Sequence, residues 1–191
     1  FNTNPTWSGD TGVFDINPAL EFWLNAPAIT AESYASLPSQ AIENATWEFF
    51  VRLDFNPSSS NNAMIYLVSD NPALTGPLNG YYVRIGGQDD EISLYRQSGG
   101  SVNEIIDGID NTVDSDPVEV RIRVTRDVAG NWELLRDTAG GTTFVSEGTV
   151  FDDVHFLSTH FGVRCDYTST RSDKFFFDDF VVTGQPYTDV I

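Results

Sequence analysis

The segment Val118-Glu-Val-Arg-Ile-Arg-Val-Thr-Arg126 carries an apolar side chain at every second position. Charged or polar side chains fill the positions between them. Successive side chains of a β-strand point to opposite faces of a sheet, so the pattern predicts a strand with one apolar and one arginine-bearing face. Such a strand covers a core on one side and is open to solvent or to a ligand on the other.

The same alternation recurs along most of the chain, and no segment carries a sustained helical stripe. Further strands are expected at 47–55, 63–69, 81–86, 91–97, 102–106, 132–137, 143–150, 160–168 and 174–183. The turn Ala129-Gly-Asn131 predicts a hairpin between the quoted strand and the next one. For segment 27–40 the sequence allows either a short helix or an irregular crossing. For segment 151–159 it allows either one helical turn or a loop. Many short strands separated by turns predict an all-β sandwich or barrel.

Composition places the chain among folded, strongly acidic domains. Its 191 residues, 40% of them hydrophobic, suffice for a single domain with a substantial core. The formal net charge of -18 argues against nucleic acid and anionic membranes as partners. No apolar run reaches the roughly 20 residues that cross a bilayer. We expect one domain over residues 1–184, a tail or linker start at 185–191, and Cys165 buried as a small hydrophobe.

The scarce positive charges are nine arginines and one lysine, and most of the arginines lie on the expected strands. If the apolar side chains of these strands face the core, one opposite face gathers aromatic, amide and guanidinium groups. The expected ligand-binding residues on that face are Tyr82, Arg84, Tyr95, Gln97, Arg121, Arg123 and Arg164, joined by Glu48, Phe50, Arg52 and Asp54 from another strand. Flat rings stack on sugars, and arginine binds oxyanions through two parallel hydrogen bonds. The alternative is a ladder of cross-strand ion pairs, each contributing about 0.2–1 kcal/mol.

The order of strands and turns resembles that of concanavalin A-like (laminin-G-like) lectin and glucanase jelly rolls. The resemblance rests on segments 81–86, 92–95, 120–126, 130–134 and 174–184, and extends over residues 47–184. The same residues also resemble modules of large secreted bacterial surface proteins. The resemblance implies a two-sheet antiparallel β-sandwich with one concave sheet, often used to hold glycans, and calcium sites at sheet edges. Such motifs specify a fold better than a function.

No catalytic arrangement stands out. The resemblance to glucanases implies carboxylates at alternate positions of one strand, and this chain has no such run. Its nearest approach, Asp89-Asp-Glu91, is expected to be a solvated hairpin loop. The side chains of Tyr82, Arg84, Tyr95 and Gln97 keep a polysaccharide lyase open as an alternative, although the two histidines fall in or beside a loop. The sequence therefore favours a domain without enzymatic activity.

Calcium is the metal that the acidic loops favour, because hard cations take carboxylate and carbonyl oxygens. Asp178 and Asp179 are the strongest candidates. Adjacent strand residues face opposite ways, so one of the two is expected to point inward, where a carboxylate needs a metal, an arginine or backbone donors. Partners other than a metal would be Arg164, Arg171 and Lys174. The acids at 107, 110, 114 and 116, and at 152 and 153, are expected to be solvated.

Together these patterns predict a non-catalytic carbohydrate-binding or adhesion module of a larger exported protein. The chain begins at Phe1 rather than methionine, which favours a mature or excised module, secreted or at the cell surface and monomeric within its parent chain. The ligand, a polysaccharide or glycan that can be anionic, is expected on the concave sheet around Arg84, Tyr95, Arg121 and Arg123. The alternatives are a polysaccharide lyase or glycoside hydrolase, and a structural or protein-interaction spacer with self-paired arginines.

Overall fold

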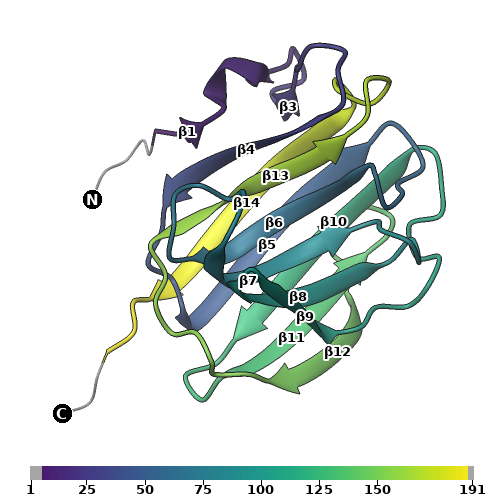
Figure 1. Cartoon of the computed structure of the whole chain (residues 1–191). Helices are drawn as coiled ribbons and strands as arrows, with labels where there is room; N and C mark the ends of the chain where they lie inside the picture. The colour runs from purple at the N-terminus through teal and green to yellow at the C-terminus, as the bar shows by residue number, and fades with distance from the viewer. Residues whose placement is uncertain (1–5, 189–191) are drawn as a thin grey trace.

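The computed structural model describes residues 6–188 and shows two seven-stranded antiparallel sheets packed as a sandwich (Figure 1). The first sheet has the order β1 (Ser8–Gly9), β4 (Ala31–Pro38), β13 (His160–Tyr167), β6 (Asn62–Ser69), β7 (Leu78–Ile85), β8 (Ile92–Gly99) and β9 (Ser101–Ile106). The second sheet has the order β12 (Val145–Phe151), β11 (Asn131–Asp137), β10 (Val118–Arg126), β5 (Glu43–Leu53), β14 (Phe175–Gln185), β3 (Phe22–Leu24) and β2 (Phe14–Ile16). A 3₁₀ turn, η1 (Thr11–Val13), precedes β2. The expected all-β sandwich is confirmed.

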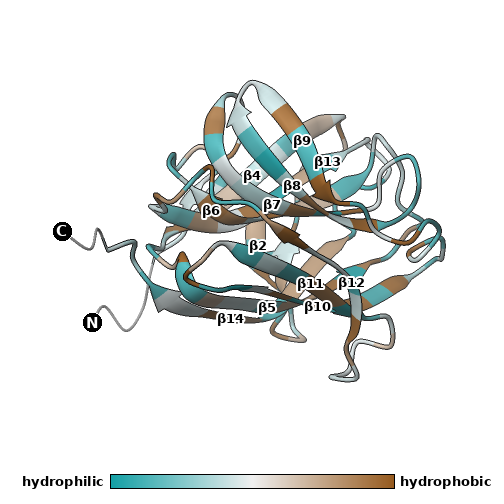
Figure 2. Cartoon of the chain, turned by 90° about the horizontal axis from the view of Figure 1, so that it is seen from below, coloured by the Kyte–Doolittle hydropathy of each residue, from teal (hydrophilic) through white to brown (hydrophobic). Residues whose placement is uncertain are grey.

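The core lies between the two sheets, which Figure 2 shows as stacked layers with β6 and β7 in one and β5 and β14 in the other. On β10 the four alternating apolar side chains are buried as the sequence predicts. Trp47 of β5 and Trp132 of β11 stack in the core with ring centroids 5.6 Å apart. Cys165 is also buried. The expected inward positions of these three side chains are confirmed.

Strand β10 has the expected bounds, and the expected hairpin joins it to β11 through the turn at Asp127–Asn131. Both expectations for segment 27–40 are wrong, because residues 31–38 form β4, which pairs with β13 along its whole length. This strand is rich in small and polar residues, so alternation was weak. Ser33 and Ser36 are nevertheless buried and hydrogen-bonded. Segment 151–159 is the end of β12 followed by a loop.

Strand β14 is the last strand of the described residues. Gln185 still pairs with Glu43 as the last residue of β14, one position beyond the expected limit. Residues 186–188 form no strand, and the remainder of the expected tail, 189–191, lies outside the described residues. Within residues 6–188, no helix has the length and apolar character needed to cross a membrane.

Candidate functional site

The expected seven-residue ligand surface is divided between opposite sides of the sandwich. Tyr82, Arg84, Tyr95, Gln97 and Arg164 belong to β7, β8 and β13 of the first sheet. The remaining two, Arg121 and Arg123, belong to β10 of the second sheet. The expectation of one shared face is therefore wrong. Alternation identifies the outer side of a strand, but β10 pairs with β5 and β11 rather than with β7 or β8.

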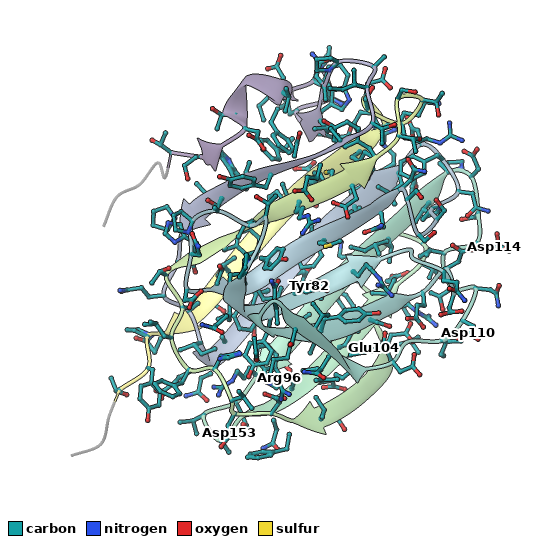
Figure 3. The ribbon with its side chains drawn as sticks, viewed as in Figure 1. Tyr82, Arg96, Glu104, Asp110, Asp114 and Asp153 are labelled. Carbon is teal, nitrogen blue, oxygen red and sulfur yellow. The ribbon has the colours of Figure 1, made fainter. Side chains whose placement is uncertain are left out.

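Tyrosine rings cover the outer side of the first sheet. Tyr82 and Tyr95 stack with centroids 5.2 Å apart, and Tyr66 lies 4.9 Å from Tyr82. Leu74 and Leu78 pack against them, so that Tyr82 and Tyr95 are each only 5% exposed. Figure 3 labels Tyr82 on this side of β7. We call this cluster of Tyr66, Tyr82 and Tyr95 the tyrosine face. The ring faces are covered by one another, and the hydroxyl groups of Tyr66 and Tyr95 donate to Gln97 and Glu104.

Burial also sets the protonation of this face. Desolvation raises the pKa of Tyr66 to about 12. The same cause raises the pKa values of Tyr82 and Tyr95 further. The three hydroxyl groups are protonated near neutral pH, as an ordinary tyrosine is, and those of Tyr66 and Tyr95 donate to Gln97 and Glu104.

Two of the expected ligand-binding side chains on this sheet are occupied by internal partners. Gln97 accepts a hydrogen bond from the Tyr66 hydroxyl, at 3.0 Å, and donates to two main-chain carbonyl groups. Arg164 lies between Asp166, at 3.0 Å, and Glu32, at 2.5 Å. Both side chains are therefore held by contacts within the first sheet.

Arg84 differs from these two. It forms no ion pair with any of the described residues. Its guanidinium lies 4.5 Å from the ring centroid of Tyr95 and donates to the Tyr95 hydroxyl, while Nε has no hydrogen-bond partner. Gly87, at φ +123°, lies beneath it, and a Cβ there would come within 3.0 Å of Nε. The half-buried Arg84 therefore lies at the edge of the tyrosine face without a carboxylate partner among the described residues, and its Nε is buried out of a ligand's reach.

The outer side of the second sheet follows the ion-pair alternative. Arg121 contacts Asp179 at 2.6 Å and Glu48 at 3.6 Å. Arg123 contacts the same Glu48 at 2.7 Å and lies 4.1 Å from the ring centroid of Phe144. On this face the arginines are paired with carboxylates across strands, as expected for a self-paired sheet.

The expected metal pair has a different geometry from the prediction. The pairing of β14 with β5 shifts register between Asp178 and Val181, and Asp179 takes a φ of 54°. As a result neither aspartate is buried, and Phe180 packs against the core instead. The expectation of an inward carboxylate is therefore wrong. The partner of Asp179 is Arg121, which was not among the expected partners, and calcium at the pair stays a prediction.

A cavity that the sequence did not indicate lies at the start of β7. It has a volume of about 310 Å³ and is lined by Asp70, Asn79, Val154, His155, Phe156 and Leu157. The Asp70 carboxylate accepts two hydrogen bonds from Asn79, both 2.8 Å long. Phe156 is 51% exposed, and its ring centroid lies 4.7 Å from that of Tyr187. The only sequence signal was an apolar Phe-Leu pair inside a loop.

A second unexpected group consists of three carboxylates, from Glu91, Glu104 and Asp107, which share a small space at the edge of the first sheet. Burial raises the pKa of Glu91 to about 7, helped by the negative charges of the other two. Glu104 also accepts a hydrogen bond from the Tyr95 hydroxyl, at 2.5 Å. The sequence placed Glu91 and Asp107 in solvated loops and gave no signal for Glu104.

Two seven-stranded antiparallel sheets in this order define a concanavalin A-like jelly roll, and comparison with solved structures confirms that fold. Carbohydrate binding module CBM66 from Bacillus subtilis has a TM-score of 0.63 and 13% identity, over 94% of this chain and 96% of that one. The exoplasmic/lumenal domain of VIP36 in its Ca²⁺- and mannose-bound form has a TM-score of 0.70 and 11% identity, over 98% and 85%.

The legume lectin-like domain from Entamoeba histolytica has a TM-score of 0.65 and 11% identity, over 95% of this chain and 90% of that one. No protein-family model matches the chain. No curated protein matches it in sequence. At such identities the likeness establishes the fold alone, and it assigns no residue of this chain a role.

Proposed function

We propose that this domain is a non-catalytic carbohydrate-binding module that holds its ligand at the outer side of the first sheet, around Arg84. The observation that carries the proposal is the Arg84 guanidinium, which has no carboxylate partner among the described residues and lies over the Tyr95 ring, donating to its hydroxyl. A guanidinium without a carboxylate partner suits the hydroxyl or carboxylate oxygens of a sugar. Support comes from solved structures of the same fold, one a carbohydrate binding module and another a lumenal domain bound to mannose.

The proposal also includes where the protein is located and which class of glycan it binds. VIP36 was solved as an exoplasmic/lumenal domain, which supports an exported location for this chain as well. An anionic glycan is the preferred ligand class because Arg84 can bind a sugar carboxylate with two N–H groups. Catalysis is not part of the proposal, so we expect no product release from uronate or glucan polymers.

Glycan-array screening followed by calorimetry tests this function, with Arg84→Ala against Arg123→Ala as a matched control on the opposite sheet. We expect Arg84→Ala to lose a ligand that Arg123→Ala retains. Absence of binding to neutral and acidic polysaccharides would remove the proposal. Loss in Arg123→Ala alone would move the ligand to the second sheet, and loss in Phe156→Ala alone would move it to the cavity near Asp70.

A structural or protein-interaction spacer is the second candidate. The self-paired outer side of the second sheet favours it, because Arg52, Arg121 and Arg123 each contact at least one carboxylate. Under this alternative the Arg84→Ala variant has no ligand to lose, and the glycan screen of the unmodified domain gives no binding.

A further inference from the structure

Three carboxylates converge where β8 and β9 lie side by side at the edge of the first sheet. Glu91 directly precedes β8, Glu104 lies on β9, and Asp107 directly follows β9. One oxygen of each carboxylate lies within 4.8 Å of the others. Figure 3 marks Glu104 on the ribbon of this edge. The group is assembled by the β8–β9 pairing, whose register shifts between Leu94 and Tyr95.

Glu91 is the buried member of this group and is only 2% exposed. Its Oε1 accepts a hydrogen bond from the Ser93 hydroxyl, at 2.7 Å. Its Oε2 has no hydrogen-bond partner among the described residues. A buried carboxylate oxygen without a donor is costly to desolvate, so this oxygen calls for a positively charged or proton-donating partner.

None of the ion pairs among the described residues brings a cationic side chain to Glu91. The acidic groups that raise its pKa are Glu104, through a side-chain hydrogen bond and its negative charge, and Asp107, through its charge. Arg84 approaches the group only through the hydroxyl of Tyr95, which donates to Glu104 Oε1 and accepts from the guanidinium. The tyrosine hydroxyl therefore stands between the guanidinium and the carboxylates, and the excess negative charge is left uncompensated.

The backbone holds the three carboxylates together. Gly108, next to Asp107, is pressed against β8, since a Cβ at this position would lie 2.2 Å from the Ile92 carbonyl oxygen. The Gly108 amide also donates to the Ser93 hydroxyl, at 2.9 Å, and that hydroxyl donates to Glu91. The segment after β9 is thus fixed beside the buried carboxylate.

We propose that Glu91, Glu104 and Asp107 bind a divalent cation, and that this cation is calcium. Three carboxylates without histidine or cysteine form a hard oxygen site, which suits calcium or magnesium rather than zinc. Glu104 and Asp107 are exposed, so water can complete the six to eight oxygen ligands that calcium takes. Magnesium demands a more regular octahedron than an open group on three separate backbone positions offers. The 2% exposure of Glu91 suits a buried ion ligand better than a group that must touch a polymer substrate.

Calorimetric titration of chelator-treated protein with calcium chloride tests the site directly. We expect one calcium ion per chain and a melting temperature that rises by roughly 5–10 °C at a calcium concentration 100 times the dissociation constant. Terbium gives a second signal, because Tyr95 donates to Glu104 and its ring can sensitise the luminescence of an ion bound there.

Variants assign the ion to its ligands. We expect Glu104→Gln and Asp107→Asn, both at exposed positions, to weaken calcium binding about tenfold or more while the domain stays folded. Glu91→Gln is expected to abolish binding and to raise the melting temperature of the calcium-free protein, because it removes one of three repelling charges. Asp178→Asn and Asp110→Asn are matched control variants that should bind calcium normally.

Three results would overturn the inference. One is the absence of heat and of any melting shift at millimolar calcium. Another is unchanged binding in both Glu104→Gln and Asp107→Asn, which also decides the matter if Glu91→Gln does not fold. The third is loss of binding in Asp178→Asn alone, which would place the ion at the Asp178 and Asp179 pair. None of these readouts needs a glycan, so a failure of the calcium site can be distinguished from a failure of the proposed function.

Discussion

Replacing Asp152 by alanine tests how the loop after β12 is held against the sandwich. The sequence placed this residue in a solvated acidic pair, but its side chain is 6% exposed. One carboxylate oxygen accepts from the Tyr81 hydroxyl at 2.6 Å and from the Val154 amide at 3.2 Å. The other pairs with Arg96. The substitution therefore removes three hydrogen bonds and leaves two buried or half-buried donors without an acceptor.

The expected loss follows from these contacts. Neutral hydrogen bonds contribute about 0.5–1.5 kcal/mol each and those to charged groups about 1.5–3 kcal/mol. Arg96 is 22% exposed and can regain water, so we place the cost of Asp152→Ala at about 3–4 kcal/mol, towards the lower part of the range for a broken buried pair. For a domain of this size that lowers the melting temperature by roughly 6–15 °C. Asp152→Asn keeps an acceptor for Tyr81 and should cost about 1–2 kcal/mol.

Urea unfolding monitored by tryptophan fluorescence measures both values, because Trp132 lies beside the site and donates to the Asp152 carbonyl. The matched control is Asp153→Ala, one residue further on and exposed (Figure 3), which should change the unfolding free energy by less than about 0.5 kcal/mol. Equal losses in Asp152→Ala and Asp153→Ala, or a loss below about 1 kcal/mol in Asp152→Ala, would refute the anchoring role.

Three further outcomes can be measured with the same unfolding assay. Gly87→Ala should cost about 1 kcal/mol or more, because it strains a residue at positive φ and crowds the Arg84 guanidinium; no loss would mean that the turn adapts. Burial lowers the pKa of His155 below its ordinary 6.5, so the contribution of His155 to stability falls as the pH drops through about 6.5, while Glu91, whose pKa is raised to about 7, contributes with the opposite sign. Between about pH 7 and pH 5 the unfolding free energy of His155→Gln should therefore fall less, or rise more, than that of the unmodified domain, and an equal pH dependence in the two proteins would show that His155 contributes nothing. Asp179→Asn should cost at most about 1 kcal/mol, since Asp179 is 57% exposed in its pair with Arg121; a larger, chelator-sensitive loss would instead indicate a structural ion at this position.

The local properties of strands could be predicted from the sequence. Alternation alone located β10 at its observed bounds and placed Trp47 and Trp132 in the core. These features depend on which side chains avoid water, and each strand carries that information in its own residues. Segment 31–38 was missed because its small and polar side chains form buried hydrogen bonds that period-two hydrophobicity does not detect.

The candidate sites depended on relations between strands, which the sequence did not carry. Arg121 was assigned to the wrong sheet because alternation does not state which strands become neighbours. The pairing shift in β14 turned Asp178 and Asp179 outward together and sent Phe180 inward. The group around Glu91 likewise depends on the β8–β9 register and could not be recognised from spacing along the chain.

The Tyr95 hydroxyl connects the Arg84 guanidinium to the proposed calcium ligand Glu104, and this connection yields a final prediction. Tyr95 accepts from Arg84 and donates to Glu104. A calcium ion that fixes Glu104 also fixes Tyr95, and through it the position of Arg84. If both proposals hold, calcium should tighten glycan binding severalfold, because a preorganised side chain loses less entropy on binding.

By linkage, the glycan must then tighten calcium binding by the same factor. Calorimetric titration of the glycan with and without calcium measures the coupling in the unmodified protein and in Tyr95→Phe. The variant removes only the hydroxyl, so calcium should still bind while the coupling disappears. Coupling that persists in Tyr95→Phe would show that the two sites communicate by another route. Calcium and glycan binding without any coupling would show that Glu104 does not restrain Arg84.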